Sequence, residues 1–283
     1  MTIAHDITPP SVHGKQYTLE QRIGLGASSV VFKGYEIRDE ARKRPVAIKV
    51  HKNDKPTRLR SEIGLLVHAT THENVAQYLD HSYAGRYIAL ELMPETLLQR
   101  FKWNTVTQQV IMDYLLQIPA ILGLFREKGI AHCDLKAGNV GYKERVMKVL
   151  DFGLAIPLQQ TVYRPSRGEV QCYLAPELHY GLVTPTSDTY SAGKIVQFLL
   201  TGDCCPTMSQ ALQDMELWHD VALPRTFKQV LRMMTQKEHV KRPAPAPLRE
   251  MTMAAAHDLD QDLYFTPQTF VTLADKVVQF LPS

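Results

Sequence analysis

The chain has 283 residues, of which 45% are apolar and 22% are charged, and its formal net charge is +3. This length allows one or two ordinary domains with a sizeable core, and the composition is typical of a soluble globular protein and not of a disordered one. The basic residues occur in short clusters, so we expect no nucleic-acid partner. The cysteines lack the spacing of a zinc site or a disulfide framework, which favours a reducing, cytoplasmic location.

We expect neither a secretory signal nor a membrane-spanning segment in this sequence. Its first residues have neither a basic start nor an apolar core. Residues 110–125 are the most apolar stretch, but Asp113 lies within it and the apolar residues follow a helical pattern. We therefore expect a core helix there and no membrane partner.

The first part of the chain predicts antiparallel strands. Residues 1–16 contain two adjacent prolines and little apolar periodicity, which indicates a flexible lead-in. Residues 17–23 and 31–36 alternate as strands, and between them Gly24 and Gly26 would let backbone N–H groups approach phosphates closely. A dinucleotide-binding turn would lead into a helix instead. A simple hairpin turn with two glycines is the alternative.

One lysine stands out in the next strand. Residues 45–49 read Pro-Val-Ala-Ile-Lys, so Lys49 follows apolar neighbours. Residues 58–70 predict a helix, and its Glu62 is the best candidate to offset the desolvation of the Lys49 ammonium. The alternative is that Glu62 is an exposed residue on the surface of the helix, because it is chosen only by its place in the sequence.

The remaining segments predict two more strands and then helices. Residues 75–83 and 87–92 read as strands on either side of a tight turn, which completes a sheet of five. From Thr96 onward the apolar residues recur at helical spacing, and residues 108–128 predict one long apolar helix. We therefore expect an α+β chain, with its sheet first and its helices after.

The densest group of reactive side chains follows this long helix. Residues 130–139 read Ile-Ala-His-Cys-Asp-Leu-Lys-Ala-Gly-Asn, and residues 150–153 read Leu-Asp-Phe-Gly. Three oxygen donors and one ammonium fall within these stretches: Asp134, Asn139, Asp151 and Lys136. Oxygen ligands beside a cation suit Mg²⁺ bound to phosphates. A polar loop between a helix and a hairpin is the alternative.

The two stretches resemble the catalytic loop and the metal-binding motif of protein kinases, which read His-Arg-Asp-Leu-Lys-x-x-Asn and Asp-Phe-Gly. Further motifs follow in the family's order over nearly the whole chain, including Ala-Pro-Glu at 175–177. Aminoglycoside-type kinases generally lack Ala-Pro-Glu, Asp-Phe-Gly and the lysine of the loop. The resemblance implies a bilobal protein kinase fold, with a five-stranded antiparallel N-lobe and a mainly helical C-lobe. Its parts would be a lead-in (1–16), the N-lobe (17–93), the C-lobe (94–257) and a helical extension (258–283).

The resemblance also implies an activity, which is transfer of the γ-phosphoryl group of ATP to a hydroxyl of a protein substrate. Asp134 would orient the hydroxyl or accept its proton, and Lys136 would stabilise the γ-phosphate. Two residues would hold Mg²⁺, namely Asn139 and Asp151. Lys49, fixed by Glu62, would hold the other phosphates of ATP.

Other residues would form the nucleotide site or support the loop. Those expected to bind ATP are Gly24, Leu25, Gly26, Ala27, Ser28, Ser29, Val31, Ala47, Lys49, Glu62, Leu90, Glu91 and Met93. Within this set, Val31 and Ala47 would pack on the adenine, Leu90 would be the gatekeeper, and the backbone of residues 91–93 would bind the adenine edge. Asp188 would tether the catalytic loop. Glu177 would pair with Arg242.

Four positions depart from the family pattern. Cys133 replaces the arginine that receives an activation-segment phosphate, which puts ordering by that route in doubt. Residues 137–138 lack an acidic residue that many basophilic kinases have, and Gly141 replaces a leucine beneath the adenine. Val170 replaces a threonine typical of serine/threonine kinases, whereas Lys136 supports that class. Serine or threonine is therefore the expected acceptor, while tyrosine or dual specificity and a nucleotide-binding pseudokinase or scaffold stay open.

Overall fold

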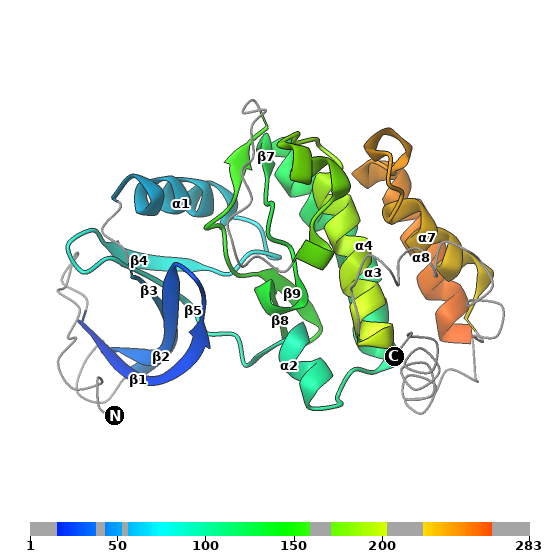
Figure 1. Cartoon of the computed structure of the whole chain (residues 1–283). Coiled ribbons are helices and arrows are strands. Elements are labelled where there is room, and N and C mark those ends of the chain that lie inside the picture. Colours follow the sequence, from blue (N-terminus) through cyan, green and yellow to red (C-terminus); the bar gives the residue numbers. More distant parts are fainter. Residues whose placement is uncertain (1–15, 38–42, 53–55, 159–170, 203–222, 262–283) are drawn as a thin grey trace, which may run out of the picture. The chain divides into compact units, whose positions relative to one another are not determined.

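The computed structural model describes residues 16–37, 43–52, 56–158, 171–202 and 223–261. The chain divides into two compact units between Pro94 and Glu95. The first unit contains a sheet and one helix, and the second is mainly helical (Figure 1). The expected lead-in up to residue 15 and the expected extension helix beyond residue 261 lie outside the described residues.

The predicted five-stranded antiparallel sheet is confirmed in the first unit. Its spatial order is β1-β2-β3-β5-β4. The strands are β1 (Gln16–Leu25), β2 (Ser29–Ile37), β3 (Lys43–His51), β4 (Tyr78–Ser82) and β5 (Tyr87–Glu91). A core cluster on one face includes Tyr17, Ile48 and Tyr87. At Gly34 an added Cβ would lie 1.9 Å from the Thr18 carbonyl oxygen, so only glycine allows β1 and β2 to approach this closely.

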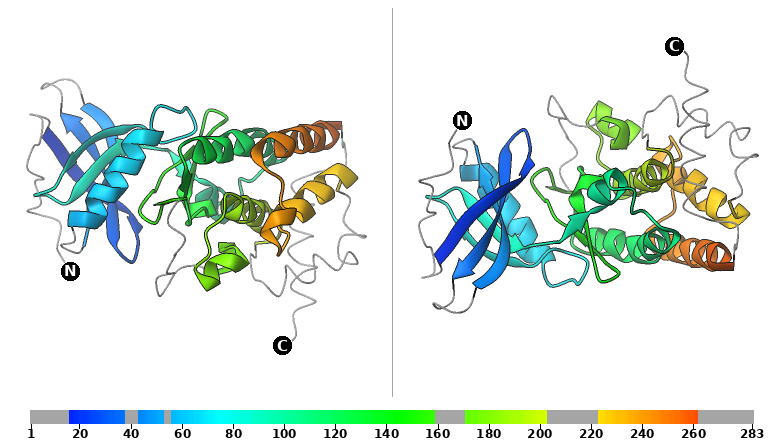
Figure 2. Two further views of the ribbon diagram at one scale, coloured as in Figure 1. Left: turned by 90° about the horizontal axis from the view of Figure 1, so that it is seen from above. Right: turned by 90° about the horizontal axis from the view of Figure 1, so that it is seen from below.

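Helix α1 (Pro56–Ala69) lies along this sheet (Figure 2). It begins two residues before the predicted start, because a proline fits the first turn, where a helix needs no N–H donor. Its buried apolar residues include Leu59, Ile63 and Leu66. The strand predicted from residue 75 begins only at Tyr78, because the Val75 N–H donates to the His72 carbonyl in a turn.

Among the described residues, four long helices form the body of the second unit. They are α3 (Gln108–Glu127), α4 (Ser187–Thr201), α7 (Arg225–Met234) and α8 (Pro245–Gln261). Helices α3 and α8 pack side by side, and α4 contacts both α3 and α7. An added Cβ at Gly193 would lie 2.8 Å from the Met234 Cβ, so this glycine lets α4 and α7 pack closely. The shorter helix α2 (Leu97–Lys102) begins at a capping box formed by Thr96 and Gln99.

Helix α3 is the predicted core helix. Of the helices that the structure describes, it alone has the length and apolar composition of a membrane span, and most of that stretch is buried within the protein. A buried core helix passes the same test of composition.

Short elements connect the helices of the second unit. The strands are β6 (Glu95–Thr96), β7 (Ile130–Ala131), β8 (Val140–Lys143), β9 (Val146–Val149) and β10 (Ile156–Pro157). The short 3₁₀ helices are η1 (Ala137–Asn139), η2 (Gln171–Tyr173), η3 (Pro176–Tyr180) and η4 (His239–Lys241). Strands β8 and β9 form a hairpin that pairs with β6, while β7 pairs with β10. The hairpin is attached to α3, because Asp113 accepts hydrogen bonds from Tyr142 Oη at 2.6 Å and Arg145 Nη2 at 2.9 Å.

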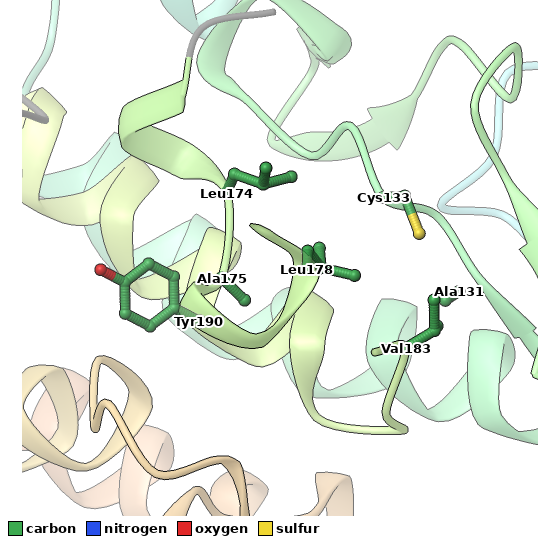
Figure 3. Close-up of a cluster of buried hydrophobic side chains, with 7 residues drawn as sticks. All are labelled: Ala131, Cys133, Leu174, Ala175, Leu178, Val183 and Tyr190. Atoms are coloured by element: carbon green, nitrogen blue, oxygen red, sulfur yellow. The ribbon is translucent and has the colours of Figure 1, made fainter. Parts of the chain in front are cut away.

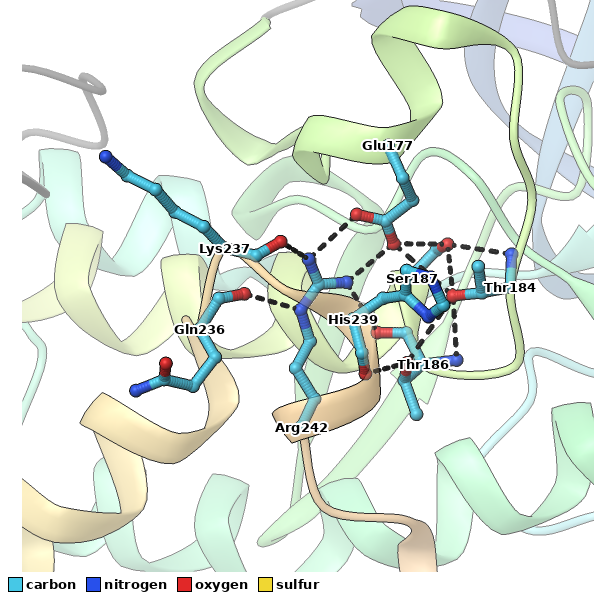
Figure 4. A network of polar contacts seen from close by, with 8 residues as sticks. All are labelled: Glu177, Thr184, Thr186, Ser187, Gln236, Lys237, His239 and Arg242. Atoms are coloured by element: carbon cyan, nitrogen blue, oxygen red, sulfur yellow. Dashed lines mark hydrogen bonds and ion pairs between the residues drawn. The ribbon is translucent and has the colours of Figure 1, made fainter.

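A buried ion pair joins η3 to the segment before α8 (Figure 4). Arg242 donates from Nη1 and Nη2 to the two carboxylate oxygens of Glu177, at 2.6 and 2.8 Å. The Ser187 hydroxyl donates to the same carboxylate at 2.8 Å. Burial by itself raises the pKa of Glu177. Arg242 and the other hydrogen-bond donors lower it by more, so the pKa lies below its ordinary value. The carboxylate therefore stays charged in the folded protein.

We predict that Arg242→Met lowers the free energy of unfolding by about 3–5 kcal/mol, because it leaves the Glu177 carboxylate buried without its cation. Urea denaturation of the purified protein measures this change. Lys241→Met is a matched control at the adjacent position. Lys241 forms an ion pair with Glu238, but the two side chains are 56% and 62% exposed, so we expect almost no change in stability. Equal stability of the two variants would contradict the prediction.

Candidate active site

Lys49 and Glu62 form a buried ion pair in the first unit. The Lys49 Nζ on β3 lies 2.6 Å from Glu62 Oε1 on α1, and the two side chains are 5% and 3% exposed. A lysine buried to this extent needs a carboxylate to offset its desolvation. The structure therefore brings together the two residues that the sequence paired by position.

The residues expected to contact adenine share one face of the sheet with Lys49. In the strand register, Val31 lies opposite Lys49, and Ala47 lies opposite Leu90. Residues directly opposite one another in an antiparallel sheet share a face, as do alternate residues of one strand. The side chains of Val31, Ala47, Lys49 and Leu90 therefore lie on the same face of the first unit.

The turn between β1 and β2 is tighter than the sequence indicates. Gly24 and Leu25 still pair with β2, and the Gly26 N–H donates to the Ser29 carbonyl at 2.9 Å, so the turn itself consists of Ala27 and Ser28. Lys52 holds this turn from the end of β3. Its N–H donates to the Ser28 carbonyl at 2.9 Å and its Nζ to the Gly26 carbonyl at 2.6 Å.

The segment expected to bind the adenine edge follows β5. Leu90 and Met93 are buried, at 7% and 8% exposure. The Glu91 N–H donates to the Gln77 carbonyl at 2.9 Å. An adenine bound here must therefore use other backbone groups of residues 91–93.

In the second unit, Asp134 is held by two neighbours in its loop. Lys136 Nζ donates to both carboxylate oxygens of Asp134, at 2.8 and 2.7 Å. Asn139 Nδ2 donates to Asp134 Oδ2 and to the Asp134 carbonyl, both at 2.9 Å. The Asp134 side chain remains 17% exposed, so the carboxylate is fixed in direction and still accessible.

The β8–β9 hairpin brings Asn139 and Asp151 together although they are distant in sequence. Its end residues, Val140 and Val149, pair with each other, and the Leu150 N–H donates to the Asn139 carbonyl at 3.0 Å. Asp151 follows Leu150 directly, and its charge raises the pKa of Asp134. Sequence spacing alone does not specify this approach.

The donor set at this end suits Mg²⁺. Asn139 directs its Nδ2 to Asp134, which leaves its Oδ1 as a metal ligand, and Asp151 adds a carboxylate whose Oδ1 accepts the Gly153 N–H at 2.7 Å. Within the described part of the chain, no three His, Cys, Asp or Glu side chains cluster as a metal site. Mg²⁺ commonly takes one or two protein oxygens and fills its shell with phosphate and water oxygens. The residues present therefore fit this ion.

Asp188 of α4 holds the backbone of the loop. Its two carboxylate oxygens accept the N–H groups of His132 at 2.7 Å and Cys133 at 3.0 Å. Cys133 has a φ of 60°, a left-handed conformation that costs a non-glycine residue roughly 1–2 kcal/mol. The tether therefore offsets a strained backbone directly before Asp134.

The Cys133 side chain lies in an apolar cluster (Figure 3). The buried members of this cluster are Ala131, Cys133, Leu174, Ala175, Leu178, Val183 and Tyr190. Where the family pattern has an arginine, this chain thus has a side chain that packs on the segment containing Ala-Pro-Glu. Val170, the other departure in that segment, lies outside the described residues.

Aromatic packing links the loop to Phe152. The His132 ring centroid lies 5.1 Å from that of Phe152 and 5.5 Å from that of Phe125 on α3. His132 Nδ1 also accepts the Asp134 N–H at 3.3 Å. The His-x-Asp and Asp-Phe-Gly stretches are therefore packed together in the second unit.

Burial raises the pKa of both Asp134 and Asp188, and the neighbours of each carboxylate only partly oppose this. For Asp134, burial raises the pKa, Lys136 lowers it and the Asp151 charge raises it, which leaves the pKa above its ordinary value of 3.8. For Asp188, burial raises the pKa to about 6 despite the two N–H donors.

Two residues near the predicted site, Lys52 and His51, were not predicted from the sequence. His51 is buried on β3, and its Nε2 lies 3.3 Å from Glu62 Oε2. The period of two along a strand could have placed His51 on the same face as Lys49. No sequence signal indicates that Lys52 reaches the glycine turn.

Comparison with known proteins agrees with the resemblance in the motifs. A family model described as "Protein kinase domain" matches residues 17–260. A probable serine/threonine-protein kinase of Clostridium acetobutylicum is 29% identical over 235 residues, which cover 76% of this chain and 34% of that relative. Human serine/threonine-protein kinase ULK1 is 28% identical over 84% of this chain and 23% of that protein. Human tyrosine-protein kinase Srms is 28% identical over 83% of this chain and 51% of that protein.

We predict that Lys136→Met raises the pKa of Asp134 further, because the variant removes the cation and the hydrogen bonds that lower it. A ¹³C NMR titration of the Asp134 carboxyl carbon measures the shift. Lys136→Arg is the matched control and should give a smaller change, since it keeps the charge. A pKa that falls in Lys136→Met would contradict this account.

We also predict that Asp188 makes folding stability depend on pH. The pKa of Asp188 is about 6 in the folded protein and near its ordinary value of 3.8 in the unfolded chain. The stabilisation that comes from protonating Asp188 in the folded protein is therefore complete below pH 3.8 and lost above pH 6. Relative to Asp188→Asn, the wild type should therefore gain about 3 kcal/mol in free energy of unfolding as the pH falls through that window. Urea denaturation of both proteins between pH 4 and 7 measures the difference, and a constant difference would contradict it.

Proposed function

Because the chain belongs to the protein kinase family, we propose that it transfers the γ-phosphoryl group of ATP to a serine or threonine hydroxyl of a protein substrate. The observation that carries this proposal is the fixed and accessible Asp134 carboxylate, held by Lys136 and Asn139. The names of two relatives support serine or threonine as the acceptor. The chain spans 34% of the length of the first of these relatives and 23% of the second.

The proposed reaction depends on positioning and on charge neutralisation. Phosphoryl transfer has a loose transition state, and the protein mainly aligns the reactants and offsets the charge on the phosphoryl oxygens. Asp134 would accept a hydrogen bond from the attacking hydroxyl and then its proton. The Lys136 ammonium, which lies beside that carboxylate, would neutralise the γ-phosphoryl group.

The nucleotide would be bound through its phosphates and its base. When bound by Asn139 and Asp151, Mg²⁺ would neutralise the phosphate charge. Lys49 would hold the remaining phosphates, and its position depends on Glu62. The adenine would pack on Val31 and Ala47, which share the Lys49 face of the sheet.

Tyrosine is the second candidate acceptor. It is favoured by the similarity to tyrosine-protein kinase Srms and by Val170, which stands where serine/threonine kinases usually have threonine. Lys136 favours serine or threonine.

We also propose a cytoplasmic location, in keeping with Cys133 and Cys172, neither of which forms a disulfide.

We predict that Asp134→Asn lowers the transfer rate by a factor of about 10²–10⁴ without unfolding the protein, because an amide cannot accept the proton. Transfer from γ-labelled ATP to the protein itself and to a generic protein acceptor measures the rate. Acid hydrolysis of the labelled product then identifies phosphoserine, phosphothreonine or phosphotyrosine.

Asp258→Asn is the matched control, because Asp258 lies on α8 and contacts Thr226 of α7. We expect it to keep the wild-type rate. Transfer by Asp134→Asn at the wild-type rate would show that another group acts as the base. Nucleotide binding without transfer in the wild type would instead identify a pseudokinase or scaffold.

A further inference from the structure

Two side chains of β3 flank the Glu62 carboxylate. Lys49 Nζ lies 2.6 Å from Oε1, and His51 Nε2 lies 3.3 Å from Oε2. Lys49 and His51 are two residues apart in one strand, so both point to the face that α1 covers. The three side chains are at most 8% exposed. Glu62 therefore has a potential donor at each of its two oxygens.

The His51 contact involves two buried polar atoms. Glu62 Oε2 and His51 Nε2 have no hydrogen bond of good geometry, although they lie 3.3 Å apart. A buried polar group without a hydrogen bond is costly. Glu62 Oε2 can only accept, and His51 Nε2 donates when it carries a proton. A hydrogen bond from His51 Nε2 to Glu62 Oε2 would satisfy both atoms.

The backbone around His51 is well fixed. The His51 N–H donates to the Arg86 carbonyl at 2.8 Å, and His51 pairs with the buried Ser29 of β2. The next residue, Lys52, holds the glycine turn by its own N–H and Nζ. The end of β3 therefore contacts both the glycine turn and α1, and His51 is its contact with the helix.

We propose that His51 is a positioning residue for Lys49. It donates from Nε2 to Glu62 Oε2, and this second donor fixes the plane of the carboxylate so that Oε1 holds the Lys49 ammonium. A carboxylate bound at one oxygen can turn about its last side-chain bond, whereas one bound at both oxygens cannot. The inference rests on the proposed role of Lys49 in binding ATP phosphates.

A double-mutant cycle tests this proposal. The proteins are the wild type, His51→Leu, Lys49→Met and the double variant, with His51→Gln added because its amide keeps a donor. The readout is the dissociation constant for ATP with Mg²⁺, measured by calorimetry in the absence of a protein substrate.

His51→Leu should weaken ATP binding by about tenfold, as is common when a group that orients a ligand-binding side chain is removed. His51→Gln should recover most of this loss. In the Lys49→Met background, His51→Leu should cause no further loss, because its effect passes through Lys49. A purely structural role would give equal losses in both backgrounds, and that result would overturn the proposal, as would unchanged binding in His51→Leu.

A second measurement does not depend on any variant folding. In ¹⁵N-histidine-labelled wild type, NMR should show His51 Nε2 protonated and coupled to its hydrogen, and a bare Nε2 would overturn the proposal. Failure of the proposed function has a different signature. If the four proteins give the expected ATP dissociation constants but the wild type transfers no phosphate, the proposed activity is refuted and the role of His51 stands.

Discussion

The arrangement of the loop at residues 130–139 depends on one buried carboxylate, that of Asp188. It accepts the N–H groups of two consecutive residues, His132 and Cys133, and so holds the backbone in a left-handed conformation immediately before Asp134. Helix α4, which carries Asp188, is buried along nearly its whole length and is therefore a rigid base. The positions of Lys136 and Asn139 around Asp134 follow from this anchorage.

Packing and ion pairing also hold the segment that follows η2. Cys133, Leu174 and Leu178 belong to one apolar cluster, and Glu177 forms a buried ion pair with Arg242. A phosphate on an activation segment could not be received by residue 133, because a cysteine side chain has no positive charge. The contacts that hold Ala-Pro-Glu in place are thus present without a phosphorylated residue.

Both units place a buried carboxylate beside the groups that are proposed to act on ATP. In the first unit Glu62 lies between Lys49 and His51, and in the second Asp188 accepts backbone donors. Two buried carboxylates of the second unit, Asp188 and Glu177, have different electrostatic surroundings. The pKa of Asp188 rises to about 6 because burial outweighs its two neutral donors, whereas Arg242 keeps the pKa of Glu177 low. A neutral donor orients a buried carboxylate, but a cation also stabilises its charge.

The sequence by itself determined the order of elements and the identity of the loop residues. Alternating and helical periodicities predicted a five-stranded sheet followed by helices. The resemblance of residues 130–139 to the protein kinase catalytic loop marked Asp134, Lys136 and Asn139 as candidate site residues. The partner of Lys49 could be chosen only by position, because the residue of a helix that meets a strand depends on how the two pack. The tertiary structure alone decided that the β8–β9 register brings Asn139 beside Leu150, that His51 reaches Glu62, and that Cys133 is buried. These are contacts between residues distant along the chain, and local periodicity carries no information about them.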